Sequence, residues 1–205
     1  MTLSSLHMIN SALDELLARV RPLLVVVQNG RRGAGAGILI EDGQVLTNYH
    51  VVARGRSFKV TLDDGASYQT RVLSHDPEVD LALLGIPANG YPTAVFSEKE
   101  PRPGEMVFAF GHPWGQRNVL TGGVLSAVTV ARTRRGEIPV LRTDARLAPG
   151  NSGGPLLNAA GEVIGLNAMI FGGDQGIAIP ASVIREFLDK ARNIMPADAV
   201  PEGVL

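Results

Sequence analysis

The sequence predicts an all-β fold, a barrel or a sandwich, with one helix before the strands and one after them. Between residues 23 and 180, short apolar runs alternate with turns rich in Gly, Pro, Asn and Asp, which is typical of many short strands. This region has no strand–helix–strand alternation of the kind that builds a parallel sheet. Apolar residues spaced three and four apart, as in a helix, occur only near the two ends of the chain.

Two helices are predicted, one at each end of this β region. The first covers residues 11–21, with Ser11 and Asp14 as a capping box and Pro22 as its end. The second covers residues 181–192 and precedes a tail, residues 193–205, that we expect to be flexible. The apolar faces that should dock on the core are Ile9, Leu13, Leu16, Leu17 and Val20 in the first helix and Val183, Ile184, Phe187, Leu188 and Ala191 in the second.

The strands are expected at the apolar runs, and Asp63-Asp64-Gly65 predicts a hairpin turn. The glycine-rich stretch Gly33–Gly37 could suggest a nucleotide site, but a dinucleotide loop follows a strand and opens a helix. Here a short strand and a turn come next, so we assign these glycines to a loop before a strand. The predicted strands are Leu23–Val27, Gly37–Ile40, Gln44–Thr47, Phe58–Leu62, Ser67–Leu73, Leu81–Ile86, Met106–Phe110, Asn118–Val130, Val140–Thr143, Pro155–Leu157, Val163–Met169 and Gln175–Ile179.

Composition indicates a packed globular unit. The 205 residues are 45% hydrophobic and 19% charged, with a net charge of −1, so nothing predicts nucleic-acid or membrane binding. Arg31-Arg32 and Arg132 with Arg134-Arg135 are interpreted as solvated loop charges, with a phosphate or acidic-peptide site as the alternative. There is no cysteine, no apolar run long enough to span a bilayer and no signal-peptide pattern, and we therefore expect a cytoplasmic location.

The most informative motif is Gly150-Asn151-Ser152-Gly153-Gly154-Pro155. Its glycines leave the hydroxyl of Ser152 and the neighbouring N–H groups accessible, as a serine nucleophile and its oxyanion site require. An ordinary β-turn is the alternative. Residues upstream in the chain favour the nucleophile.

The upstream candidates are a histidine and a carboxylate. His50 ends a strand-like run in the half of the chain opposite Ser152. Asp80 enters an apolar run, where a carboxylate is costly to bury without a partner, so it is the candidate that orients His50 and stabilises its imidazolium. Asp76 is the alternative, but Pro77 follows it and the pair fits a turn. The chain order His, Asp, Ser is that of chymotrypsin-like double β-barrels.

These and other stretches resemble the HtrA/Deg family of trypsin-like serine proteases over about residues 22–190, in the family's order. The resemblance implies a chymotrypsin-like double β-barrel and a serine endopeptidase that acts on unfolded or exposed polypeptide without a metal or cofactor. The matching stretches are Gly35–Ile38, Thr47–Val52, Asp80–Leu84, Gly111–Gly115, Thr121–Ala127, Thr143–Ala145, Pro149–Pro155 and Gly176–Pro180.

The resemblance also implies a domain organisation. Residues 1–22 are an N-terminal helical segment and residues 23–192 the protease domain. Within it, barrel one covers about residues 23–86, a Pro-rich linker residues 87–103, barrel two about residues 104–180 and a closing helix residues 181–192. His50 and Asp80 would then meet Ser152 across the cleft between the barrels.

Roles in the site follow from the same resemblance. Ser152 attacks the scissile carbonyl, His50 moves the proton and Asp80 orients His50. The turn Gly150-Asn151-Ser152 provides the oxyanion hole through the N–H groups of Gly150 and Ser152. Arg146 takes the place at the base of the primary pocket, so cleavage after Lys or Arg is not expected. A small apolar pocket lined by Leu147, Met169 and Ile170 predicts small or medium aliphatic residues at the cleaved position, with core packing as the alternative for Met169 and Ile170.

Three departures from the family pattern bear on activity and regulation. Ala168 stands where many relatives have Ser or Thr, a hydroxyl that would help hold the aspartate. Relatives carry PDZ modules after the protease domain, whereas none is expected in this chain. The resemblance implies a possible oligomer, since relatives form trimers partly through aromatic residues near the start of the domain, but no aromatic residue precedes Tyr49, which argues against a trimer here.

Two other functions are compatible with the same fold. One is a non-catalytic peptide-binding or chaperone-like module that holds exposed polypeptide in the cleft. The other is an esterase or transacylase, because acyl transfer to water or to another acceptor uses the same residues.

Overall fold

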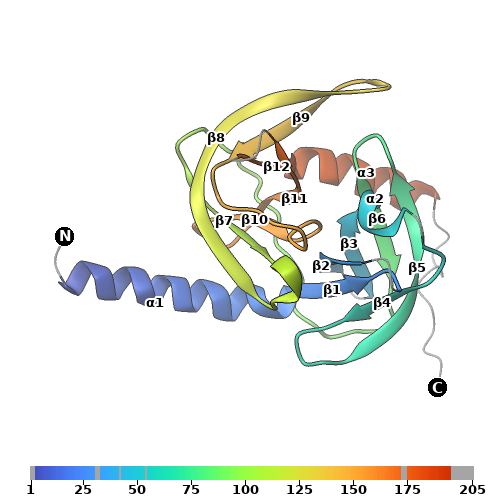
Figure 1. Cartoon of the computed structure of the whole chain (residues 1–205), viewed down its shortest axis with the longest axis horizontal. Helices are drawn as coiled ribbons and strands as arrows, with labels where there is room; N and C mark the ends of the chain where they lie inside the picture. Colours follow the sequence, from blue (N-terminus) through green and yellow to red (C-terminus); the bar gives the residue numbers. More distant parts are fainter. Residues whose placement is uncertain (1–2, 31–32, 42, 54, 172–174, 195–205) are drawn as a thin grey trace.

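The computed structural model of the chain describes residues 3–30, 33–41, 43–53, 55–171 and 175–194. It contains two closed antiparallel β-barrels with a helix at each end (Figure 1). The all-β double barrel predicted from the sequence is therefore confirmed. Among the described residues, no helix is long and apolar enough to cross a membrane.

Each barrel is a six-stranded sheet that closes because its first and last strands pair with each other. Barrel one has the order β1-β2-β3-β6-β5-β4 and closes through β1 and β4. Barrel two has the order β10-β11-β12-β9-β8-β7 and closes through β7 and β10. The bounds are β1 Leu24–Gln28, β2 Ala34–Glu41, β3 Gln44–Asn48, β4 Phe58–Thr61, β5 Ser67–Asp76, β6 Leu81–Gly85, β7 Met106–Gly111, β8 Val119–Thr133, β9 Gly136–Thr143, β10 Pro155–Asn158, β11 Val163–Phe171 and β12 Gln175–Pro180.

A continuous apolar core joins the two barrels. Strand β6 illustrates it, because successive side chains of a strand point to opposite faces. Ala82 and Leu84 belong to the cluster inside barrel one, whereas Leu81 and Leu83 belong to a cluster shared with Phe110 and other residues of barrel two. The near-continuous hydrophobic run of β6 thus reflects burial on both faces and fixes one barrel against the other.

Helix α1 covers Leu3–Val20, and a short 3₁₀ helix, Arg21–Leu23, connects it to β1. The predicted start at residue 11 is therefore wrong, and Ser11 and Asp14 lie inside the helix rather than at its cap. Leu16 and Val20 are buried in the shared core, whereas Ile9 is 45% exposed. Figure 1 shows why: the N-terminal part of α1 projects away from the barrels.

Helix α3 covers Ala181–Ile194 and buries the predicted apolar face, including Ile184 and Phe187, in the shared core. The segment between β6 and β7 is attached to both barrels. Its Ala94 N–H donates to Leu39 O in barrel one (2.8 Å), and its Ser97 N–H donates to Val163 O in barrel two (3.0 Å). The residues of the predicted flexible tail beyond 194 lie outside the described residues.

Two local features near the cleft differ from the sequence predictions. The turn after β3 is a single helical turn, α2, Tyr49–Val52. Strand β2 begins at Ala34, three residues before the predicted start at Gly37, so Gly35 lies within a strand and not in a loop. The physical reason is close approach: a Cβ on Gly35 would lie 2.8 Å from the side chain of Val51 and 3.0 Å from Ser152 O.

Candidate active site

His50 and Asp80, both in barrel one, are joined by two hydrogen bonds. His50 is the second residue of α2, where its backbone N–H donates to Asp80 Oδ1 at 2.8 Å. Its ring Nδ1 lies 2.7 Å from Asp80 Oδ2. Because a carboxylate only accepts hydrogen bonds, Nδ1 carries the proton and Nε2 is left as the acceptor. The tautomer that can take a proton from a nucleophile is therefore the favoured one.

The backbone of Asp80 is held in an uncommon conformation just before β6. Its φ is 55°, a value that costs a non-glycine residue of order 1 kcal/mol and needs support from its surroundings. The support comes from Asp80 O, which accepts hydrogen bonds from the Tyr49 N–H (3.1 Å) and from Asn48 Nδ2 (3.0 Å). Asn48, a fully buried residue, is thus a site residue that sequence reasoning did not identify.

The alternative carboxylate, Asp76, has a different partner. It ends β5, and its Oδ1 accepts the backbone N–H of Glu78 at 2.9 Å, as expected of an aspartate that stabilises a turn. The structure thus brings Asp80, and not Asp76, to His50.

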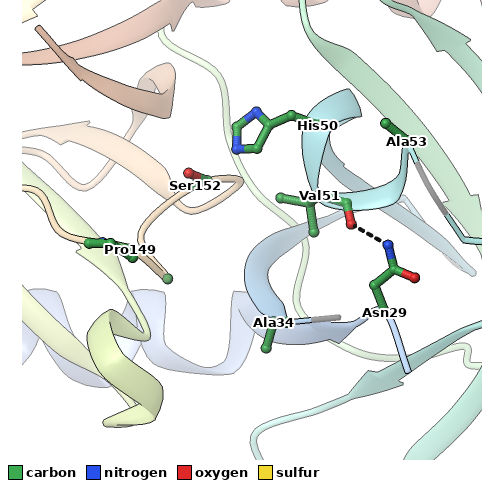
Figure 2. A pocket seen from close by; sticks show the side chains of 9 residues that line it. Asn29, Ala34, His50, Val51, Ala53, Pro149 and Ser152 are labelled. Carbon is green, nitrogen blue, oxygen red and sulfur yellow. Dashed lines mark hydrogen bonds between the residues drawn. The ribbon is translucent and has the colours of Figure 1, made fainter. Parts of the chain in front are cut away.

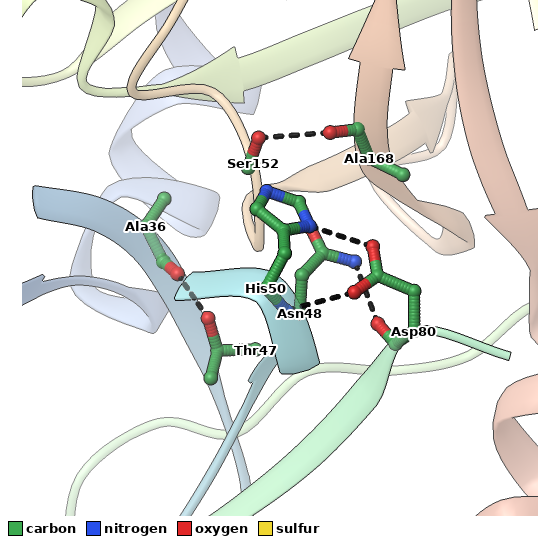
Figure 3. A network of polar contacts seen from close by, with 7 residues as sticks. All are labelled: Ala36, Thr47, Asn48, His50, Asp80, Ser152 and Ala168. Atoms are coloured by element: carbon green, nitrogen blue, oxygen red, sulfur yellow. Dashed lines mark hydrogen bonds and ion pairs between the residues drawn. The ribbon is translucent and has the colours of Figure 1, made fainter. Parts of the chain in front are cut away.

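Ser152 lies in the turn before β10, on the barrel-two side of the cleft. Its carbonyl accepts the N–H of Ala36 in β2 (2.8 Å), which ties the turn to barrel one. Its Oγ donates to the carbonyl of Ala168 at 2.8 Å. Figure 3 shows the His50 ring between Asp80 and Ser152, with Nε2 on the side of the serine. In this structure the hydroxyl is therefore bonded to Ala168 and not to His50.

The backbone at Gly150 is fixed by two hydrogen bonds from one loop. The N–H of Trp114 donates to Pro149 O (2.9 Å), and the N–H of His112 donates to Gly150 O (3.1 Å). In a trans peptide the C=O and the N–H point in opposite directions, so the Gly150 N–H is directed away from Trp114. Among the described residues, neither the Gly150 N–H nor the Ser152 N–H has an acceptor. These two donors are therefore available to a ligand.

Asn151, the third residue of the predicted oxyanion turn, has its N–H already bonded to Ala148 O (2.9 Å). Its side-chain amide is buried and makes no hydrogen bond to any residue in the described part of the chain. Asn151 thus shapes the turn, and the free donors belong to its two neighbours.

A groove of about 1110 Å³ runs between the barrels, and both His50 and Ser152 line it together with Gly150 (Figure 2). Its wall in barrel one is held by a hydrogen bond from Asn29 Nδ2 to Val51 O (3.1 Å). The groove is open to solvent, and residues of both barrels line it. It can hold an extended chain.

A second cavity, of about 870 Å³, lies in barrel two behind the same turn. Arg146, Leu147 and Asn151 line it, and Leu147 also packs into the core of barrel two, where a Cβ on Gly176 would lie 2.8 Å from it. The backbone of Met169 and Ile170 belongs to β11, but their side chains lie outside the described residues, as do Arg31 and Arg32.

His112 is a buried residue of the loop that holds Gly150, 4% exposed. Its Nδ1 accepts the N–H of Asn118 at 3.2 Å. Burial lowers the pKa of His112 from 6.5 to about 4, and the positive charge of Arg117 acts in the same direction. The ring is thus neutral over the physiological range. The sequence motif Gly111–Gly115 identified this loop as part of the family resemblance. It did not predict the hydrogen bond from the His112 N–H to Gly150 O.

Two closed barrels with a His–Asp pair in one and a serine turn in the other define the class of trypsin-like peptidases. A family model described as "Trypsin-like peptidase domain" matches residues 35–166. The chain belongs to this family.

Curated relatives place the chain more narrowly. It is 39% identical over 170 residues to a probable periplasmic serine endoprotease DegP-like from Halomonas elongata, covering 80% of this chain and 36% of that protein. It is 38% identical over 167 residues to serine protease HTRA1 from Xenopus tropicalis, covering 78% of this chain and 36% of that protein. The chain thus spans about a third of the length of these relatives, and the HtrA/Deg resemblance is confirmed. The word "periplasmic" in the first name runs against the cytoplasmic location expected from the sequence.

Solved structures agree with this assignment. The serine endoprotease from Yersinia pestis has a TM-score of 0.80 and 30% identity, over 88% of this chain and 66% of that one. Rv3671c from M. tuberculosis H37Rv, in an inactive form with a serine-to-alanine mutation, has a TM-score of 0.81 and 25% identity, over 89% of this chain and 92% of that one.

Proposed function

We propose that the chain is a serine endopeptidase that cleaves unfolded or exposed polypeptide with Ser152, His50 and Asp80. The observation that carries this is the 2.7 Å contact of His50 Nδ1 with Asp80 Oδ2, on the opposite side of the ring from Ser152 (Figure 3). A structural histidine has no need of a carboxylate on one ring nitrogen and a serine near the other.

The first half of the reaction forms an acyl-enzyme. Ser152 Oγ leaves Ala168 O, bonds to the scissile carbonyl carbon and gives its proton to His50 Nε2. The N–H groups of Gly150 and Ser152 stabilise the negative charge on the carbonyl oxygen, and Asp80 stabilises the imidazolium. His50 then gives the proton to the leaving amine as the peptide C–N bond breaks. In the second half, His50 takes a proton from a water molecule, whose oxygen bonds to the carbonyl carbon of the ester. As the bond from that carbon to Ser152 Oγ breaks, His50 returns the proton to Oγ, which frees the acid product and restores the serine.

The substrate class follows from the groove. It is open to solvent and lies between the two barrels, so an extended segment can enter it, whereas a folded protein presents few such segments. At the cleaved position we propose small or medium aliphatic residues, because Leu147 contributes apolar surface to the second cavity. The charged residues of the same lining, Arg146 and Asp144, have opposite signs, so the cavity presents no unbalanced negative charge to a cationic side chain. A pocket of this kind distinguishes one methylene by only about 1–3 kcal/mol, so selectivity should be loose.

A resting form of the same protein is the second candidate, favoured by one observation. Ser152 Oγ is bonded to Ala168 O at 2.8 Å and so is not yet committed to His50. A form in which the groove binds peptide without cleaving it would keep this bond.

Cleavage of denatured casein, with the products mapped by mass spectrometry, tests the proposal. We expect new termini after small or medium aliphatic residues and no products from Ser152→Ala. Cleavage mainly after Arg or Lys would overturn the proposed specificity. Binding of casein by wild type without any new terminus would favour the peptide-binding form.

A further inference from the structure

Glu78 joins the two barrels beside the candidate active site. Its Oε2 accepts the backbone N–H of Arg134 (3.1 Å) and the backbone N–H of Arg135 (3.3 Å). Glu78 lies in the turn between β5 and β6 of barrel one, whereas Arg134 and Arg135 form the tip of the β8–β9 hairpin of barrel two. We call this contact the Glu78 clasp.

The hairpin needs an anchor of this kind. Strand β8 pairs with β7 only as far as Val124, and β9 pairs with β12 only from Leu141 onward. Between these points, the described pairings join β8 and β9 to each other alone, and Figure 1 shows them as an arm reaching beyond barrel two. A two-stranded ribbon by itself is at best marginally stable in water.

The tip is shaped to present backbone donors and not side chains. Thr133 pairs with Gly136, which leaves Arg134 and Arg135 as a two-residue loop. Thr133 Oγ1 accepts the Arg135 N–H (3.2 Å) and donates to Gly136 O (3.1 Å). Both arginines are exposed, so Glu78 meets their N–H groups, and a carboxylate bound by N–H donors forms charge-assisted hydrogen bonds.

The other end of the clasp leads directly to Asp80. The N–H of Glu78 is bonded to Asp76 Oδ1, which closes the turn that leads to Asp80. Asp80 itself has a φ of 55° and is held from its C-terminal side by Asn48 and Tyr49, both of barrel one. The clasp holds the same turn from its N-terminal side and attaches it to barrel two, the barrel that carries Ser152.

We propose that Glu78 is a positioning residue, which fixes the Asp80–His50 pair relative to Ser152 by anchoring the Asp80 turn to the tip of the β8–β9 hairpin. The predicted effect on kcat rests on the proposed function. The predicted effect on the orientation of the His50 ring does not, because it can be measured without catalysis. A displacement of the Asp80 turn changes the orientation of the His50 ring and leaves the groove largely as it is. It should therefore affect kcat more than KM.

The kinetic test compares Glu78→Ala with three variants. Glu78→Gln keeps an oxygen that can accept both N–H groups. Arg134→Ala combined with Arg135→Ala removes both side chains but keeps the backbone donors. Glu137→Ala removes an exposed carboxylate from the same hairpin, where it lies 3.5 Å from Arg132, and serves as the matched control.

For Glu78→Ala we expect kcat on a peptide substrate to fall about tenfold with KM within about twofold of wild type. Glu78→Gln should recover most of kcat, and the arginine and Glu137 variants should match wild type. If Glu78→Ala and Glu137→Ala have the same kcat, or if Glu78→Ala lowers only the melting temperature, Glu78 does not position the pair.

The second readout is the proton NMR signal of His50 Nδ1–H, which reports the bond to Asp80 whether or not the protein cleaves anything. We expect this signal to shift or broaden by exchange in Glu78→Ala and to be unchanged in Glu137→Ala. If wild type does not cleave but the signal still responds in this way, the clasp stands and the proposed function fails. If the signal is the same in Glu78→Ala and wild type, the clasp fails whatever the activity.

Discussion

The backbone N–H of Trp114 donates a 2.9 Å hydrogen bond to the carbonyl oxygen of Pro149. This bond sets the orientation of the peptide between Pro149 and Gly150, and so turns the Gly150 N–H toward the groove. Trp114 itself has a φ of 55° and is 76% exposed. Its contribution is therefore made by its backbone, while its ring remains in solvent.

The first prediction concerns Gly150→Ala. A Cβ at this position would lie 2.2 Å from His112 O, and the φ of 109° is unfavourable for alanine. The turn must then move, and the Gly150 N–H leaves its orientation. We expect kcat to fall by about 10²–10³, the usual cost of losing one oxyanion donor. Kinetics on a peptide substrate measure it.

Gly65→Ala is the matched control for this change. Gly65 also has a positive φ, 93°, but nothing lies within 4 Å of the position of its Cβ. It should lose about 1 kcal/mol of stability and keep its kcat. Equal losses of kcat in the two variants would mean that backbone strain, and not the oxyanion donor, is responsible.

The second prediction separates the two carboxylates. Asp80→Asn keeps the shape of the side chain but offers an N–H to His50 Nδ1, which favours the tautomer that cannot accept the serine proton. A change of this kind typically lowers kcat about 10⁴-fold. Asp76→Asn keeps an amide oxygen that can accept the Glu78 N–H, so the turn is preserved and most of the activity should remain. If Asp76→Asn were the more damaging substitution, the assignment of Asp80 would be wrong.

The third prediction concerns the pH dependence of stability. The pKa of His112 is lowered to about 4 in the folded protein, so between pH 6.5 and pH 4 the unfolded chain binds a proton that the folded protein does not. The stabilising effect of the neutral ring is thus complete above about pH 6.5 and is lost as the pH falls. At pH 5 the loss is about 2 kcal/mol relative to pH 7.

His112→Asn should abolish this part of the acid sensitivity, because the amide oxygen can accept the Asn118 N–H as Nδ1 does and does not titrate. Urea unfolding of both proteins at pH 7 and pH 5 measures it. Carboxylates contribute equally to both proteins, so the difference between them isolates His112. Parallel losses of stability would show that His112 is not the titrating group.

The fourth prediction concerns how α1 is attached. Leu16 is 3% exposed and packs in the core that the two barrels share, whereas Ile9 on the same helix is 45% exposed. Leu16→Ala should lower the free energy of unfolding by about 2–4 kcal/mol, and Ile9→Ala by less than about 0.5 kcal/mol. Similar costs for both would place the whole helix against the barrels.

The strands could be predicted from the sequence where an apolar run lies between turn residues, because that pattern is local. Strand β9 begins at Gly136 and not at the predicted Val140, because most of its first residues are polar or turn-forming and carry no such pattern. The start of α1 could not, because Ser4, Ser5, Asn10 and Ser11 lower helix propensity and Ser11 with Asp14 imitates a cap. Gly35 was assigned to a loop because a glycine-rich stretch is locally typical of one. What requires glycine there is the approach of Val51 and Ser152, which are distant in the chain.

The three proposed catalytic residues were found because each one interrupts a local pattern: an exposed turn at Ser152, a histidine after a strand, a carboxylate before one. The residues that support them were not found, because their roles are tertiary. Asn48 and Trp114 act through single hydrogen bonds to Asp80 and Pro149, and Glu78 acts through a hairpin about fifty residues away. The bond of Ser152 Oγ to Ala168 O depends on the rotamer of the Ser152 side chain, which could not be predicted from the sequence.

The central claim is that Ser152 is a nucleophile activated by His50. Labelling with a fluorophosphonate probe, with and without denatured casein, tests it most directly on wild type beside Ser152→Ala and His50→Ala. The account predicts that wild type alone is labelled, at Ser152, with casein increasing the rate if the bond to Ala168 must first open. No labelling of wild type in either condition, or labelling that persists in Ser152→Ala, would contradict it.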